Sequence, residues 1–319
     1  MKIVVNGSVA FDYLMSFPGK FKDSFIEGQL ENISLSFLVE SMIRQRGGTG
    51  PNIAYTMALL GGDPLVLATA GQDFGEYRAW LDSHGVDTSA IIDIEDDYTA
   101  SFFVNTDQVQ NQIASFYPGA MAKASMLSLK QNAPDAELVI ISPNDPVLMH
   151  NLADECRDNN IRYIFDPSQQ AAFMNGEQLL HGLDGCYILT VNEYENQLIQ
   201  EKTGLTQDEI LDKVGGLLIT KAEKGSQLIL EGESYEFPIF PPEKIVEPTG
   251  AGDAFRGGLL RSMQLGLSWE LAGRVGALAA TYVLEQVGPQ SHHFTPASFV
   301  DRFRKHEDDN GALDILLAS

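Results

Sequence analysis

Positive charge is scarce in this 319-residue chain. Only 21 Lys and Arg residues accompany 44 Asp and Glu residues, so the formal net charge is −23. Nucleic acids and anionic membranes are bound through basic surfaces, and this balance therefore argues against both as partners. The acidity is explained by a solvated acidic surface.

Cysteine is almost absent as well. Cys156 and Cys186 belong to no CxxC pair, which argues against a disulfide framework or a thiolate metal site. His292 and His293 have no second cluster of ligands, so a zinc site is not expected. Residues 1–7 indicate a first strand rather than a signal peptide, and no long apolar run follows. We expect a cytoplasmic protein, because a reducing compartment suits so few thiols.

Several well-known catalytic motifs are also missing. No GxxxxGK[ST] occurs, which excludes a P-loop enzyme, and no GxSxG elbow is present. Residues 73–75 spell the Asp-Phe-Gly of protein kinases, but the other segments of that signature are absent. Residues 250–252 lack the third glycine of the dinucleotide fingerprint and lie late in the chain.

Strand-like apolar runs alternate with helix-like stretches along the chain. This alternation is typical of a parallel sheet covered by helices on both faces, so the sequence predicts a doubly wound α/β fold in a single domain, 1–319. The strands are expected at 3–5, 65–68, 138–141, 163–165, 187–191 and 217–220, and helices at 52–60, 77–84 and within 254–284, with a break near 266–268.

Two regions, at about 12–46 and 94–117, do not follow this alternation of strands and helices. Residues 99–104 and 112–117 have the composition of paired strands around a polar turn. We expect the two regions to form a small β-sheet lid over the main domain.

The most informative segment is 247–255. Two glycines around Ala251 let the backbone approach a bound group, and the helix expected next would direct its first N–H groups at an anion such as phosphate. Asp253 falls where a carboxylate would face the same space. An anion site beside a carboxylate suits phosphoryl transfer to a hydroxyl. The alternative is a tight loop before a helix.

Three further segments carry candidate ligands. Gly47 and Gly48 leave room for a ligand, and Asn52 can both donate to and accept from sugar hydroxyls, although it could be only a helix cap. Asp12 follows the first strand, where it could accept two hydroxyls or lie in a surface turn. Asn192 and Glu195 share a helix face and suit phosphate and hydrated Mg²⁺, or else form a capping box.

In their order and spacing these segments resemble the PfkB or ribokinase-like carbohydrate kinases, over nearly the whole chain. The resemblance rests on residues 47–52, 71–87, 192–195, 220–225 and 248–253. It implies an ATP- and Mg²⁺-dependent kinase in which Asp253 is the base that takes a proton from a primary hydroxyl.

The resemblance also implies roles for the other candidate residues. The amides of Gly250, Ala251 and Gly252 would stabilise the transferred phosphoryl group, and Glu195 would hold Mg²⁺ through water. The acceptor would be bound by Ser8, Asp12, Gly47, Gly48 and Asn52. The nucleotide would be bound by Asn192, Thr220, Gly225 and Thr249.

Two departures bear on specificity. Glu247 stands where the family usually has Asp at a monovalent-cation site, which argues against assuming K⁺ activation. Thr49 stands where ribokinases typically have Lys, which counts against ribose. The segments 34–38, 100–103 and 111–121 look most like bacterial adenosine kinase-like proteins.

We therefore expect a nucleoside kinase that prefers adenosine and yields AMP, and an aromatic-rich lid would suit a stacked purine. The phenylalanines could instead pack the lid on the domain, and a kinase for ribose, fructose or a related sugar is the alternative. A non-catalytic nucleotide or sugar sensor has no need of Asp253. A monomer and a homodimer are both compatible with the sequence.

Overall fold

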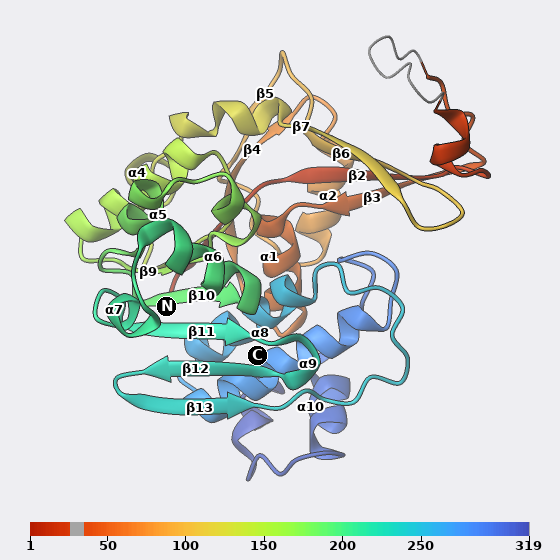
Figure 1. Cartoon of the computed structure of the whole chain (residues 1–319). Helices are drawn as coiled ribbons and strands as arrows, with labels where there is room; N and C mark the ends of the chain where they lie inside the picture. The colour runs from red at the N-terminus through yellow and green to blue at the C-terminus, as the bar shows by residue number, and fades with distance from the viewer. Residues whose placement is uncertain (26–34, 319) are drawn as a thin grey trace.

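A computed structural model describes residues 1–25 and 35–318, and its main body is a nine-stranded sheet (Figure 1). The strand order is β13-β12-β11-β10-β9-β8-β1-β4-β5. Seven strands run parallel, and β12 and β13 add an antiparallel hairpin at one edge. The strands are β1 (Ile3–Asn6), β4 (Leu65–Gly71), β5 (Ile91–Ile94), β8 (Leu138–Ile141), β9 (Arg162–Phe165), β10 (Ile188–Asn192), β11 (Gly216–Thr220), β12 (Ser226–Leu230) and β13 (Glu233–Phe237).

Helices cover both faces of this sheet, as the buried apolar runs of its central strands require. One face carries α1 (Thr49–Leu59), α2 (Gly75–Ser83), α8 (Ala251–Leu265), α9 (Trp269–Leu284) and α10 (Pro296–Arg304). The other carries α3 (Leu129–Asn132), α4 (Pro146–Asp158), α5 (Gly176–Leu183), α6 (Glu193–Thr203) and α7 (Gln207–Leu211). This arrangement confirms the predicted doubly wound α/β fold.

A separate four-stranded sheet projects from the body (Figure 1). Its order is β3 (Ser41–Gly47), β2 (Ala10–Ser16), β6 (Ala100–Thr106) and β7 (Gln112–Tyr117). The predicted pairing of the last two strands is present and antiparallel. Part of the lid range expected from the sequence, residues 26–34, lies outside the described residues.

The β12–β13 hairpin was not predicted. Its two turn residues, Glu231 and Gly232, have φ values of 53° and 81°, as a type I′ turn requires. Asn-Gly and Asp-Gly are the usual signals for this turn, and a glutamate in the first position does not give one. The sequence signal of this edge is therefore weak.

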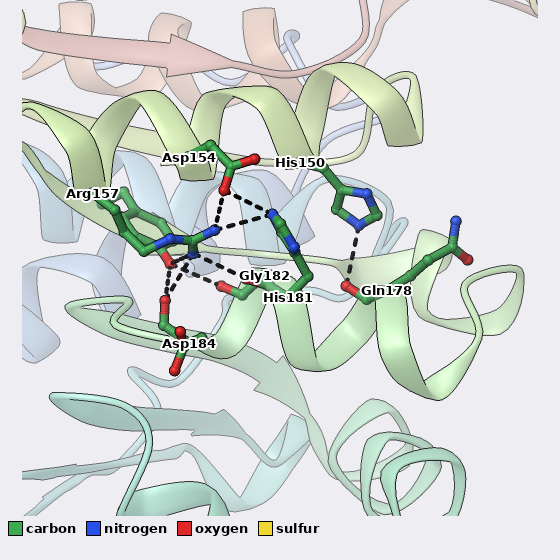
Figure 2. Close-up of polar contacts among 8 residues, drawn as sticks. His150, Asp154, Arg157, Gln178, His181, Gly182 and Asp184 are labelled. Atoms are coloured by element: carbon green, nitrogen blue, oxygen red, sulfur yellow. Dashed lines mark hydrogen bonds and ion pairs between the residues drawn. The ribbon is translucent and has the colours of Figure 1, made fainter.

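Helices α4 and α5 are joined by Arg157, which lies between them in Figure 2. Its Nη1 donates to the carbonyl oxygens of His181 and Asp184, and its Nη2 donates to the carboxylate of Asp154.

Within residues 1–25 and 35–318, no helix is long and apolar enough to span a membrane.

Candidate active site

A cavity of about 710 Å³ opens at the carboxyl ends of the parallel strands, beside the small sheet. Ligand sites of open α/β sheets lie at this edge. Most of the predicted site residues line the cavity, although they come from distant parts of the chain: Ser8, Asp12, Gly48, Asn52, Asn192, Glu195, Thr220, Thr249, Gly250, Gly252 and Asp253. Gly47, Ala251 and Gly225 are not among the lining residues.

The N-terminus of α8 forms one end of this cavity. Gly250 caps the helix with φ of +86°, a conformation that side chains rarely adopt. The N–H of Ala251 donates to the carbonyl of Pro248 at 3.2 Å. Within the described part of the chain, the N–H groups of Gly250 and Gly252 have no acceptor. The amides of Gly250 and Gly252, two of the three that the sequence suggested, are therefore free to bind an anion.

Asp253 is held at the same end of the cavity by two donors. It is 7% exposed. Its Oδ2 accepts a hydrogen bond of 2.8 Å from Nδ2 of Asn52, and its Oδ1 accepts one of 2.6 Å from Nη2 of Arg256. The pair with Asn52 depends on close packing of α1 and α8, because a Cβ at Gly257 would lie 2.6 Å from the carbonyl oxygen of Ile53.

Asp12 lines the cavity from β2. Burial, together with the negative charge of Glu247, raises the pKa of Asp12 to about 6. Gly47 explains this position, since a Cβ there would lie 2.5 Å from Oδ2 of Asp12. Gly47 therefore makes room for a cavity residue without lining the cavity itself.

Four large apolar side chains also line the cavity, and we refer to them together as the apolar slot. Phe102 and Phe116 come from the small sheet, whereas Met121 and Phe173 come from the main body. Phe173 is 82% exposed, so most of its ring is free to contact a ligand. The sequence suggested no role for the segment that carries it. Aromatic side chains such as these can stack on a flat aromatic ring.

Asn192 and Glu195 form the capping box that was the alternative to a ligand role. Asn192 Oδ1 accepts from the N–H of Glu195, and Glu195 Oε2 accepts from the N–H of Asn192, each at 2.8 Å. Both residues also line the cavity, and the second oxygen of Glu195 is not used by the capping box. The two interpretations are thus compatible.

Glu195 lines the cavity and suits a hydrated Mg²⁺, whereas Asp166 is not among the lining residues. Asp166, which directly follows β9, is fully buried, and its Oδ1 has no hydrogen-bond partner. Glu195 is near enough to contribute to raising the pKa of Asp166, which burial brings to about 7. Carboxylate oxygens and water are the ligands that Mg²⁺ prefers. Among the described residues, no group of three or more His, Cys, Asp or Glu side chains could hold a metal ion.

Three residues of this site were not identified from the sequence. Arg256 and Asp166 form an ion pair of 3.0 Å beside Asp253, and Gln290 donates to Oδ1 of Asn52 at 2.7 Å. Arg256 could have been found, because a residue three positions after Asp253 shares its helix face. Nothing local in the sequence marks the other two.

A family model described as pfkB family carbohydrate kinase matches residues 10–295. The chain is similar to a solved nucleoside kinase of Burkholderia thailandensis in complex with inosine, with 34% identity, a TM-score of 0.84, and coverage of 95% of this chain and 97% of that one.

Two further relatives differ in their acceptors. A nucleoside kinase of Methanocaldococcus jannaschii is 29% identical over 96% of this chain and 97% of its own. Its solved structure has a TM-score of 0.85. A ribokinase of Haemophilus influenzae is 23% identical over 91% of this chain and 94% of its own.

Proposed function

Because this chain belongs to the pfkB family of carbohydrate kinases, we propose that it transfers the γ-phosphoryl group of ATP to the 5′-hydroxyl of a nucleoside, with adenosine preferred. A kinase of nucleosides or sugars follows from the family and the relatives together. The observation that carries the narrower proposal is that one cavity contains both Asp253 and the slot of Phe102, Phe116 and Phe173.

The reaction would begin at Asp253. Its carboxylate takes the proton of the 5′-hydroxyl as the hydroxyl oxygen attacks the γ-phosphorus. The bond to the β-phosphate oxygen breaks, and its electron pair leaves with ADP. The free amides of Gly250 and Gly252 donate to the oxygens of the transferred group, where negative charge is spread in the transition state. Mg²⁺, held by Glu195 through water, would neutralise part of the phosphate charge.

The remaining cavity residues would orient the two substrates. Ser8, Asp12, Gly48 and Asn52, which line the cavity, would bind the sugar hydroxyls of the acceptor, and Gly47 would support Asp12. Asn192, Thr220 and Thr249, which also line the cavity, would bind the nucleotide. Gly225, with φ of +89°, shapes the loop after β11, where a Cβ would lie 2.2 Å from the carbonyl oxygen of Phe237.

The base would lie in the apolar slot. Stacking on an aromatic side chain tolerates several bases and is worth about 1–3 kcal/mol per base. This supports a nucleoside over a free sugar, which would leave three phenylalanines without a partner. A relative that binds inosine supports a purine in this place.

A sugar kinase is the second candidate, because a ribokinase is among the relatives. We also expect a cytoplasmic protein that is a monomer or a homodimer. For the catalytic residues the proposal rests on geometry and on the family motifs.

The test is an ADP-release assay with Mg-ATP against adenosine, inosine, guanosine, cytidine, ribose and fructose, with and without potassium. We expect turnover with adenosine and weaker turnover with the other purine nucleosides. Turnover with a free sugar and none with any nucleoside would overturn the proposal. Equal rates in the presence and absence of potassium would show that Glu247 does not support cation activation.

A further inference from the structure

Arg256 is the only positively charged residue among the described residues that line the cavity. It lies one turn beyond Asp253 on α8, and its side chain is 12% exposed. Its Nη2 donates to Oδ1 of Asp253 at 2.6 Å, and its Nε lies 3.0 Å from Oδ2 of Asp166. One guanidinium therefore bridges two carboxylates.

Asp166 gives this bridge a rigid anchor. It follows β9 directly and is fully buried, and its Oδ2 accepts a hydrogen bond of 2.7 Å from Oγ of Ser142, which follows β8. A buried carboxylate needs a cationic or hydrogen-bonding partner. Asp166 has both, so the guanidinium is tied to the ends of two central strands rather than to a loop.

The other side of Asp253 is fixed through Asn52. The Oδ1 of Asn52 accepts from Nε2 of Gln290 at 2.7 Å, which leaves the Nδ2 of Asn52 to donate to Asp253. Gln290 also donates to the hydroxyl of Tyr77, which in turn donates to the carbonyl of Gly47. The amide of Asn52 therefore has one satisfied orientation.

Asp253 is thus held by two donors on opposite sides, one to each oxygen. A carboxylate has about four acceptor positions, so about two stay free for the hydroxyl of the acceptor. The planar fork of an arginine can bridge two carboxylates in a fixed geometry, whereas an ammonium group acts as a point charge on a flexible stem. An arginine is therefore better suited than a lysine to span the two carboxylates.

We propose that Arg256 is a positioning residue for phosphoryl transfer: anchored on Asp166, it holds the carboxylate of Asp253 in the orientation that accepts the proton of the acceptor hydroxyl. This inference rests on the proposed role of Asp253 as the base. Displacing a catalytic group by about 1 Å can lower the rate ~10²-fold, so an effect on kcat of this size is expected.

The experiment measures kcat and both KM values of the full chain between about pH 5 and pH 9 for Arg256→Met and Arg256→Lys. For Arg256→Met we expect kcat to fall ~10²-fold while both KM values change less than about threefold. The acid limb of kcat should move to higher pH, because a cation beside a carboxylate favours its charged form. A purely structural role would not move this limb. The kcat of Arg256→Lys should be about tenfold higher than that of Arg256→Met, since lysine restores the positive charge without the planar fork of the guanidinium.

The matched control is Arg261→Met, which removes another buried arginine from α8. Arg261 contacts the carbonyl of Leu60 and the side chain of Gln264, away from the cavity. We expect the kcat of Arg261→Met to be within about twofold of wild type, although its loss of thermal stability should be similar to that of Arg256→Met. Should Arg256→Met not fold, Arg256→Lys and Asp166→Asn carry the same test.

A double-mutant cycle with Asp166→Asn tests the bridge itself. If both residues act through one bridge, the double variant should be about as slow as the slower single variant. If the fold-losses in kcat of the two single variants multiply in the double variant, the inference is overturned. A near-normal kcat for Arg256→Met would also overturn it, as would a rise of about tenfold in the KM for ATP at unchanged kcat, because that pattern indicates a phosphate ligand.

Asp253→Asn, measured in parallel, distinguishes this inference from the proposed function. If Asp253→Asn is inactive while Arg256→Met is normal, only the inference about Arg256 fails. If Asp253→Asn is itself near normal, the assignment of the base fails.

Discussion

Asn52 and Asp253 lie 201 positions apart in the chain, and a hydrogen bond of 2.8 Å joins their side chains. Each belongs to a glycine-rich segment at the start of a helix, α1 for Asn52 and α8 for Asp253. In the proposed function, this hydrogen bond joins a residue that would bind the acceptor to the residue that would take its proton. Binding an acceptor hydroxyl and removing its proton would thereby occur at adjacent atoms.

Asp253→Asn should remove most of the turnover and leave binding intact. The amide has the shape of the carboxylate but cannot take a proton, and a general base commonly supplies ~10²–10⁴-fold in rate. We expect kcat to fall by this factor. Isothermal titration should give an unchanged affinity for ADP. A variant with near-normal kcat would show that another group is the base.

Phe173→Ala should weaken binding of a nucleoside acceptor without slowing chemistry. The exposed ring would lose its stacking on the base, worth about 1–3 kcal/mol, so we expect the KM for adenosine to rise about tenfold. Tyr98→Ala is the control, because Tyr98 is also exposed but lies outside the cavity. Equal KM values for adenosine in Phe173→Ala and wild type would show that Phe173 does not contact the base.

Gly48→Ala should destabilise the protein more than Gly204→Ala. Both glycines have positive φ, at +92° and +73°, so both substitutions strain the backbone by about 1–3 kcal/mol. At Gly48 the new Cβ would also lie 2.3 Å from the carbonyl oxygen of Ser8, whereas at Gly204 it would meet nothing within 4 Å. Urea unfolding should show a larger loss for Gly48→Ala. Equal losses would show that the backbone near Ser8 can move.

Buried His292 should make the protein less stable in acid. Burial lowers its pKa from 6.5 to about 4. The unfolded chain therefore binds this proton first, so stability is present above pH 6.5 and is lost as the pH falls from 6.5 toward 4. The full effect of such a shift is about 3 kcal/mol.

The measurement compares wild type with His292→Gln by urea unfolding near pH 7.5 and near pH 4.5. Asp12 acts with the opposite sign, because its pKa is raised in the folded state, and its contribution cancels in the difference between the two proteins. We expect the wild type to lose stability relative to the variant in acid. A difference that does not change with pH would contradict the burial of a neutral imidazole.

Local chemistry explains which parts of the fold could be predicted. The central strands are buried on both faces and therefore appear as continuous apolar runs, as at Leu138–Ile141, where the predicted and observed bounds agree. The helix break near Gly266 was also predicted, and there Gly266 ends α8 with φ of +71°. By contrast, α1 begins at Thr49 rather than at the predicted residue 52, because Gly48 and not Asn52 caps it.

By itself the sequence determined the doubly wound fold, the order of the family's motifs, and the candidate residues at the two glycine-rich segments, since each depends on residues close together in the chain. Only the tertiary structure decided the partners of Asp253, the anchoring of Arg256 on Asp166, and the place of Phe173 in the cavity wall. These contacts join separate elements across the carboxyl edge of the sheet. No local pattern specifies them, because their geometry depends on how the helices and strands pack.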